Sequence, residues 1–125
     1  MSNRNTKPRS NKPRIAIVAT GGTIASTASD SAQLGDYQVS SDAQSLVSAV
    51  PEINDVADLV FDQVSNIESH EINDDVLQRI ALSVQGFCDR DDIDGVVLTH
   101  GTDTLEETAY LVHLAVDTCK PIVMV

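Results

Sequence analysis

The sequence predicts an α/β fold built on a parallel sheet, and three observations lead to this prediction. Short, almost continuous apolar runs, as at 14–20 and 95–98, are typical of strands that are buried on both faces. Segments with apolar residues at helical spacing, over 76–87 and 105–118, follow such runs. Strands that alternate with helices favour right-handed parallel crossovers between neighbouring strands.

The first half of the chain combines one clear strand with less regular segments. Residues 1–13 are polar and contain two prolines, so we expect a disordered basic tail. Residues 14–20 (RIAIVAT) predict a buried strand, which two glycines end. Residues 24–40 are rich in Ser, Ala, Asp and Gly without a sustained period, which indicates a long mobile loop. A short helix is expected over roughly 43–50, ended by Pro51.

The second half is more regular. A further strand is expected within 56–64, and Asn73 is a suitable N-cap for the helix that follows it. The apolar residues of that helix fall on one face: Val76, Leu77, Ile80, Ala81, Val84 and Phe87.

A buried strand at 95–98 leads into a helix over about 105–118. Thr104 and Glu107 have the spacing of a capping box at the start of this helix. Residues 121–125 begin another apolar strand, and the sequence stops inside it. Because an unfinished strand leaves an open edge, we expect 14–125 to be an incomplete N-terminal α/β domain of a longer protein.

Composition and charge exclude several classes of function. The chain has 125 residues, 42% of them apolar and 3% aromatic, so one domain with an aliphatic core is expected. Five of its eight basic residues lie in the first fourteen positions, and the remainder carries three basic and nineteen acidic side chains. A body this acidic repels nucleic acid and anionic membranes. The two cysteines, Cys88 and Cys119, provide neither a disulfide framework nor a metal-ligand spacing.

Targeting signals are absent from the sequence as given. The first fourteen residues are polar, so they do not form a secretory signal, and no apolar run is long enough to cross a bilayer. We therefore expect a cytoplasmic protein, or a periplasmic or secreted one if a signal has been removed.

Three polar clusters follow three of the predicted strands. Because the carboxyl ends of parallel strands meet at one edge of a sheet, where α/β folds bind ligands, we expect the three clusters to converge. The clusters are Thr20-Gly21-Gly22-Thr23, Asn66-Ile67-Glu68-Ser69-His70 and Thr99-His100-Gly101-Thr102-Asp103-Thr104.

The first cluster has more than one interpretation. Two glycines expose backbone N–H groups, and the hydroxyl of Thr23 next to them can act as a nucleophile beside an oxyanion-binding backbone. A phosphate cradle is a weaker alternative, because the Walker spacing and its lysine are missing. For so short a motif taken alone, a tight turn without a chemical role is the favoured interpretation.

The other clusters offer polar groups that can bind a ligand or serve the fold. Thr102 and Asp103 lie at the start of a predicted helix, whereas His100 is better explained as a structural hydrogen-bonding residue. Ser69 and His70 can equally be turn residues. Tyr37 lies in the predicted loop, where a phenol can close over a ligand or simply pack against the body.

Two of these segments resemble the signatures of one enzyme family. Residues 17–25 (IVATGGTIA) resemble the first signature of the bacterial-type L-asparaginases, and residues 95–105 (GVVLTHGTDTL) resemble the second. Residues 106–110 and 49–51 are similar to the type II-like branch, which includes glutaminase-asparaginases. The resemblance covers 14–125 and implies a flavodoxin-like N-terminal domain. It also implies hydrolysis of L-asparagine to L-aspartate and ammonia without a metal or an organic cofactor.

The resemblance also implies roles for individual residues. Thr23 matches the threonine nucleophile that forms the acyl-enzyme intermediate, and Tyr37 matches the loop tyrosine that closes over the site. Thr102 and Asp103 match the second threonine and the aspartate that contact substrate, while Ser69 matches the serine that binds the α-carboxylate. Gly22 and Thr23 then provide backbone donors, and His70 and Gly101 border the substrate. The family further implies a homo-oligomer, expected to be a tetramer.

Two departures from the family pattern affect this interpretation. His70 stands where relatives usually carry Gln or Glu, so recognition of the amino acid is expected to differ. The catalytic lysine of the family lies beyond the second signature, outside residues 1–125, so we expect this polypeptide alone to show no asparaginase activity. Three alternatives remain: a glutaminase-asparaginase, the related amidotransferase subunit, and a non-catalytic α/β module that binds a small ligand.

Overall fold

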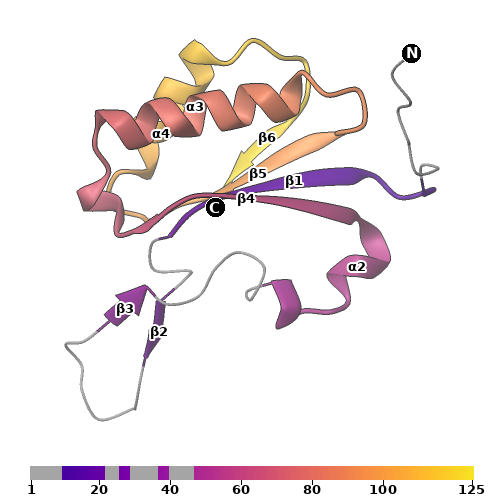
Figure 1. Cartoon of the computed structure of the whole chain (residues 1–125), viewed down its shortest axis with the longest axis horizontal. Coiled ribbons are helices and arrows are strands. Elements are labelled where there is room, and N and C mark those ends of the chain that lie inside the picture. Colours follow the sequence, from indigo (N-terminus) through magenta and orange to yellow (C-terminus); the bar gives the residue numbers. More distant parts are fainter. Residues whose placement is uncertain (1–9, 22–25, 29–36, 40–46) are drawn as a thin grey trace, which may run out of the picture.

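A four-stranded parallel sheet forms the centre of the computed structural model, which describes residues 10–21, 26–28, 37–39 and 47–125. Two helices, α3 (Asp74–Cys88) and α4 (Leu105–Ala115), lie together on one face of this sheet (Figure 1). The strand order is β4-β1-β5-β6, which confirms the predicted parallel α/β fold. The strands are β1 (Arg14–Gly21), β4 (Asp58–Ile67), β5 (Gly95–Thr99) and β6 (Ile122–Met124).

The central strand β1 explains why its sequence is almost continuously apolar. It lies between β4 and β5 and pairs with both, so it has no free edge. Ala16 and Val18 are fully buried in the core that α3 and α4 cover, whereas Ile17 and Ala19 belong to a second apolar cluster. Because successive side chains of a strand point to opposite faces, burial on both faces requires apolar residues at every position.

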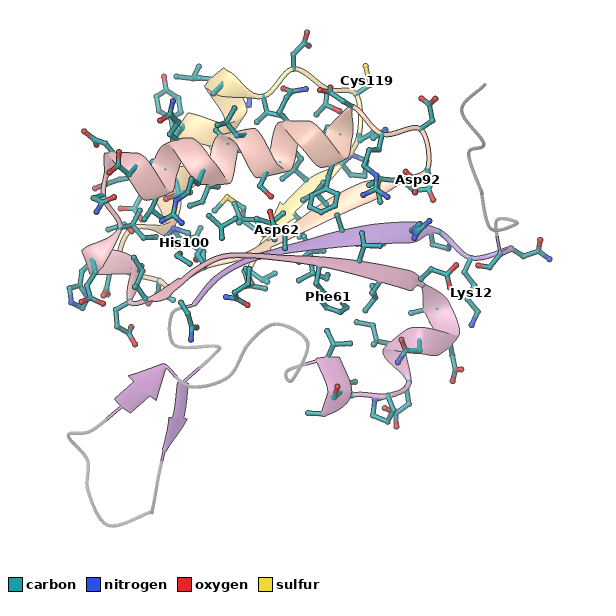
Figure 2. All side chains as sticks on the ribbon, in the orientation of Figure 1. Lys12, Phe61, Asp62, Asp92, His100 and Cys119 are labelled. Carbon is teal, nitrogen blue, oxygen red and sulfur yellow. The ribbon has the colours of Figure 1, made fainter. Side chains whose placement is uncertain are left out.

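The neighbouring strand β4 alternates in the same way but with mixed polarity. Phe61 points away from the two helices and Asp62 points toward them (Figure 2). The carboxylate of Asp62 accepts a hydrogen bond from the Ser83 hydroxyl of α3. This bond explains how a charged residue is accommodated between the sheet and a helix.

Helix α3 forms as the sequence predicts. The side chain of Asn73 accepts a hydrogen bond from the backbone N–H of Val76 at 3.1 Å, so the predicted N-cap is confirmed. Two aspartates in the first turn suit the positive end of the helix dipole. The buried residues recur every four positions and form the stripe that covers the sheet: Val76, Ile80, Val84 and Cys88.

The prediction for α4 is confirmed at its start, Leu105, but is wrong about its end and its cap. The helix ends at Ala115 rather than near 118, and Thr104 occupies the N-cap position without making a side-chain capping bond. The Thr104 hydroxyl donates to the carbonyl of Ser69, so its described hydrogen bond is a tertiary contact and not a capping bond. A capping box occurs at the short 3-10 helix η2 (Ser69–Glu71), between Glu68 and Glu71.

Three further expectations need correction. Within the segment predicted to be a loop over 24–40, β2 (Ser26–Ala28) pairs antiparallel with β3 (Tyr37–Val39). Strands of three residues are too short to show a period in the sequence. The four-residue helix α2 (Ile53–Val56) was not predicted, and β4 extends to Ile67 beyond the expected 56–64.

Part of the predicted helix over 43–50 lies outside the described residues. Val47 and Ser48 are helical, and the chain turns before Pro51 as expected. No helix among the described residues is both long and apolar enough to cross a membrane.

Candidate active site

The described residues of the three polar clusters lie at one edge of the sheet, as the sequence predicts. Strands β4, β1 and β5 are adjacent and parallel, so their carboxyl ends lie side by side. The first cluster begins at the end of β1, the second at the end of β4, and the third at the end of β5. This edge is where parallel α/β sheets bind ligands.

At the end of β1, Thr20 and Gly21 hold the strand ends together. Thr20 is buried, and its hydroxyl donates to the carbonyl of Thr99 at 2.9 Å, while its own carbonyl accepts from the Ser65 hydroxyl at 2.9 Å. Gly21 has a φ of 103°, and a Cβ added there would lie 2.6 Å from the backbone nitrogen and oxygen of Ile67. A side chain therefore does not fit at this position, where the chain leaves the sheet.

The two residues that follow Gly21 carry part of the predicted chemistry. Gly22 and Thr23, which follow β1 in the sequence, lie outside the described residues. Tyr37 is the first residue of β3, where its backbone pairs with that of Ala28. The roles predicted for these three residues stay predictions.

The second and third clusters are in direct contact through Ser69 and Gly101. Ser69 is only 2% exposed, and a Cβ added to Gly101 would lie 2.6 Å from the Ser69 oxygen Oγ. Gly101 thus allows the loop after β5 to press against Ser69. The hydroxyl of Thr104 donates to the Ser69 carbonyl at 2.9 Å and links the same two segments.

Next to this contact, the side chains of His70 and Asp103 lie at the surface. The Nδ1 atom of His70 lies 3.8 Å from a carboxylate oxygen of Asp103, and both side chains are about two-thirds exposed, at 65% and 66%. Thr102 is also exposed. The predicted residues that the structure brings together therefore comprise one buried hydroxyl, a glycine and three accessible polar side chains: Ser69, Gly101, His70, Thr102 and Asp103.

His100 supports the loop rather than facing solvent. It is 3% exposed, and its Nδ1 lies 2.7 Å from the carbonyl oxygen of Gly101. Since a carbonyl only accepts hydrogen bonds, Nδ1 carries the proton in this arrangement. The backbone N–H of His100 donates to the carbonyl of Val125 at 2.8 Å. These bonds agree with the structural role that the sequence favours for His100.

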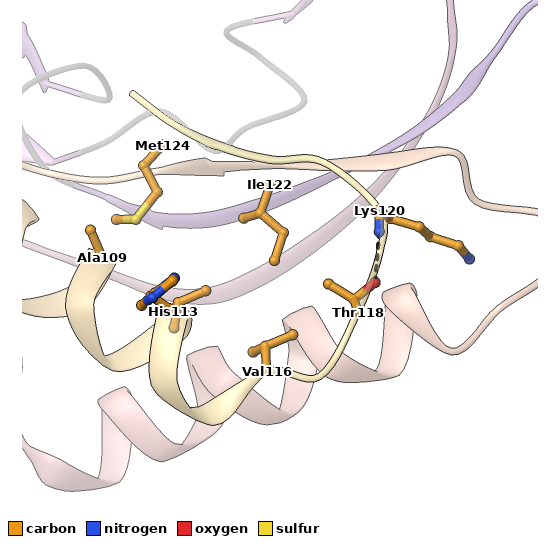
Figure 3. Close-up of a pocket in the computed structure, with 8 residues that line it drawn as sticks. Ala109, His113, Val116, Thr118, Lys120, Ile122 and Met124 are labelled. Atoms are coloured by element: carbon orange, nitrogen blue, oxygen red, sulfur yellow. Dashed lines mark hydrogen bonds between the residues drawn. The ribbon is translucent and has the colours of Figure 1, made fainter.

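A separate cavity of about 480 Å³ lies between α4 and β6 (Figure 3). None of the predicted site residues whose side chains the structure describes lines it, and its wall is mostly aliphatic apart from His113, Thr118 and Lys120. Among the described residues no group of three or more His, Cys, Asp or Glu side chains is arranged to hold a metal ion. The carboxyl edge of the sheet is the candidate site, because the polar side chains of Ser69, His70 and Asp103 gather there.

Fold and site together define a class of protein: a parallel α/β domain that presents hydroxyl, carboxylate and imidazole groups at the carboxyl edge of its sheet. Residues 14–125 match the family model described as "Asparaginase, N-terminal", and the chain belongs to this asparaginase family.

Individual relatives agree with this assignment. L-asparaginase 2 of Escherichia coli (strain K12) is 47% identical over 114 residues, which are 90% of this chain and 32% of the relative. Glutaminase-asparaginase of Pseudomonas fluorescens biotype A is 42% identical over 112 residues, 89% of this chain and 31% of the relative. The crystal structure of a probable cytoplasmic L-asparaginase from Campylobacter jejuni superimposes with a TM-score of 0.83 at 42% identity, covering 90% of this chain and 35% of that one. The chain thus spans about a third of the length of the curated relatives it matches.

Proposed function

We propose that the protein carrying this sequence is an L-asparaginase-type amidohydrolase, which converts L-asparagine to L-aspartate and ammonia. The observation that carries the proposal is the convergence of Ser69, Thr102 and Asp103 beside the end of β1, directly before Gly22 and Thr23. The arrangement offers separate groups for the α-ammonium and the α-carboxylate of an amino acid. Membership of the asparaginase family supports the same reaction.

Amino-acid binding follows from the charges at this edge. The exposed carboxylate of Asp103 is suited to hold the α-ammonium group by a charge-assisted hydrogen bond. The hydroxyl of Ser69 is the proposed donor to the α-carboxylate, and His70 and Thr102 border the same space. With both groups on the α-carbon held, the side chain that carries the amide is the free end of the substrate, and the proposal assigns its amide to Thr23.

The proposed reaction uses a threonine nucleophile. The hydroxyl of Thr23 attacks the side-chain amide carbon and forms a tetrahedral oxyanion, which backbone N–H groups at Gly22 and Thr23 stabilise. Tyr37 is the proposed partner in moving the hydroxyl proton. Ammonia then leaves with the transferred proton, and water hydrolyses the aspartyl ester to release L-aspartate and the free hydroxyl.

A second substrate is favoured by one specific comparison, since several relatives are named glutaminase-asparaginases. L-Glutamine differs from L-asparagine by one methylene group, and a pocket discriminates against such a change by only about 1–3 kcal/mol. We therefore include L-glutamine as a candidate substrate. Assembly into a homo-oligomer, which the family resemblance suggests to be a tetramer, belongs to the same proposal.

The test is ammonia release from L-asparagine and L-glutamine by the complete polypeptide that carries this sequence. Thr23→Ala removes the proposed nucleophile and should abolish ammonia release while binding of L-aspartate persists. Thr23→Ser keeps a hydroxyl and should retain part of the activity. Turnover by Thr23→Ala near that of the unchanged protein would contradict the assignment. Binding of L-aspartate without any turnover by the unchanged protein would favour the non-catalytic binding module.

A further inference from the structure

We propose that Thr104 is a positioning residue, which holds Ser69 in the place where its hydroxyl meets the α-carboxylate of the amino acid. The inference rests on the proposed function and assigns a role to a residue that local sequence marks as a helix cap. Thr104 acts through Ser69 and need not touch the substrate itself.

The first argument is the partner that the Thr104 hydroxyl has. Thr104 stands at the N-cap of α4, where a threonine side chain ordinarily accepts a hydrogen bond from the first turn. No such bond forms, and the hydroxyl donates instead to the Ser69 carbonyl, 35 residues away in the sequence. The hydrogen bond that the Thr104 side chain makes is therefore a tertiary contact at the candidate site.

The second argument is how the turn at Ser69 is built. Glu68 and Glu71 close the turn with their own side chains and backbone N–H groups, and these bonds set its local shape. They do not fix where the turn lies relative to the loop after β5. That placement depends on contacts between the two segments, and the Thr104 hydrogen bond and the close approach of Gly101 to Ser69 are two of them.

The third argument concerns which atom of Ser69 accepts the hydrogen bond from Thr104. Thr104 binds the backbone carbonyl, so the side-chain hydroxyl stays available to a ligand. The other hydrogen bond to this carbonyl, from the backbone N–H of Ile72, is longer at 3.3 Å. Loss of the Thr104 hydroxyl thus leaves the carbonyl of a buried residue with its weaker partner, and the turn is then free to shift.

The experiment measures ligand dissociation constants for three variants of the protein by calorimetry. Thr104→Val removes the hydroxyl at almost constant volume, and Thr104→Ser retains it. Thr108→Val is the matched control on the same helix, because Thr108 is 1% exposed and its hydroxyl has no partner among the described residues. Thermal unfolding checks that each variant is folded. If Thr104→Val does not fold, Thr104→Ala carries the same prediction.

Two ligands distinguish a loss of Ser69 positioning from a general loosening of the binding site. L-Aspartate has the α-carboxylate, whereas L-isoasparagine carries an amide in its place. We expect Thr104→Val to weaken binding of L-aspartate by about 3- to 10-fold, the range of one neutral hydrogen bond, and that of L-isoasparagine by less than about 2-fold. Thr104→Ser and Thr108→Val should bind both ligands almost as the unchanged protein does. In a Ser69→Ala background the effect of Thr104→Val should disappear.

The outcomes distinguish the inference from the proposed function. Equal weakening of both ligands, or no weakening by Thr104→Val, overturns the role of Thr104 while the proposed function stands. Failure of the unchanged protein to bind L-aspartate overturns the proposed function and this inference with it.

Discussion

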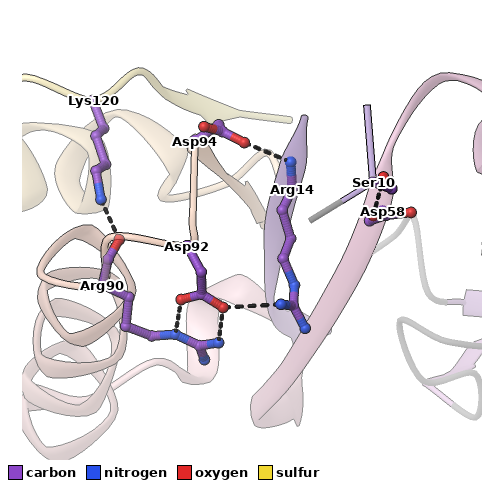
Figure 4. Close-up of polar contacts among 7 residues, drawn as sticks. All are labelled: Ser10, Arg14, Asp58, Arg90, Asp92, Asp94 and Lys120. Atoms are coloured by element: carbon purple, nitrogen blue, oxygen red, sulfur yellow. Dashed lines mark hydrogen bonds and ion pairs between the residues drawn. The ribbon is translucent and has the colours of Figure 1, made fainter. Parts of the chain in front are cut away.

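The two ends of the sheet are held together by different interactions. At the amino end, where β1 begins and β5 is about to start, charged side chains are paired with one another (Figure 4). Asp92 accepts two hydrogen bonds from Arg90, at 2.9 and 2.8 Å, and one from Arg14 at 2.9 Å. The hydrogen bond from Arg90 is the main reason why the pKa of Asp92 falls to about 2.

At the carboxyl end, neutral groups hold the strands and loops. Thr20 donates to the Thr99 carbonyl, Thr104 donates to the Ser69 carbonyl, and glycines at 21 and 101 allow close backbone approach. The carboxylates of Glu68 and Glu71 accept backbone hydrogen bonds within their own turn, and that of Asp103 lies 3.8 Å from His70 at the surface. His100 and Asp92 mark the two opposite ends in Figure 2.

This difference bears on the proposed role of Asp103, which requires a carboxylate that no basic side chain occupies. Only three basic residues follow Arg14, and two of them, Arg90 and Lys120, lie together at the amino end. The third, Arg79, donates to the carbonyl of Val64. Within the described part of the chain, Asp103 therefore has no Lys or Arg partner, and a substrate ammonium group can take that place.

The largest expected effect tests the neutral contacts of the carboxyl end. Gly21→Ala places a Cβ against the backbone of Ile67 at a positive φ, so we expect the free energy of unfolding to fall by about 3 kcal/mol. Gly86→Ala is the control, because nothing lies within 4 Å of the added Cβ on helix α3, and it should stabilise by about 0.5–1 kcal/mol. Urea unfolding measures the free energy of unfolding of both variants, and equal values would contradict the role given to Gly21.

A smaller effect is expected at the amino end. Asp92→Asn removes an ion-paired carboxylate that is 38% exposed, so we expect a loss of at most about 1 kcal/mol and no change in ligand affinity. Because the pKa of Asp92 is lowered from 3.8 to about 2, its contribution is present above about pH 4 and disappears as the pH falls toward 2.

Unfolding curves of the two proteins should accordingly converge in acid, and the exposed Asp91→Asn variant is the control. A difference between Asp92→Asn and the unchanged protein that grows as the pH falls would show that the ion pairs do not act as described.

The smallest effect is expected for the surface pair. His70→Gln removes one partner of an exposed contact at 3.8 Å, so we expect stability to change by less than about 0.5 kcal/mol. Affinity for L-aspartate should change by no more than about 3-fold, since an exposed ion pair contributes little. Calorimetric titration of His70→Gln and of the unchanged protein measures this affinity. A much larger loss of affinity would place His70 among the main substrate contacts.

Much of the fold was determined by local patterns in the sequence. The apolar runs of β1 and β5, the stripe of α3 and the Asn73 cap all depend on residues close together in the chain, and each is confirmed. The order of strands and helices was then enough to bring Ser69, Gly101, Thr102 and Asp103 to one edge. The chemical roles of these residues, and of Thr23 and Tyr37, stay predictions.

Other features have no recognisable pattern in the sequence, or were decided by contacts between distant parts of the chain. The pairing of β2 with β3 and the helix α2 involve three or four residues each, too few to produce a recognisable period. Thr104 shows the reason most clearly. A threonine hydroxyl at a helix start can bond to its own first turn or to a distant carbonyl, and the local sequence is the same in both cases. Only the fold, which brings Ser69 within 2.9 Å, determines which bond forms.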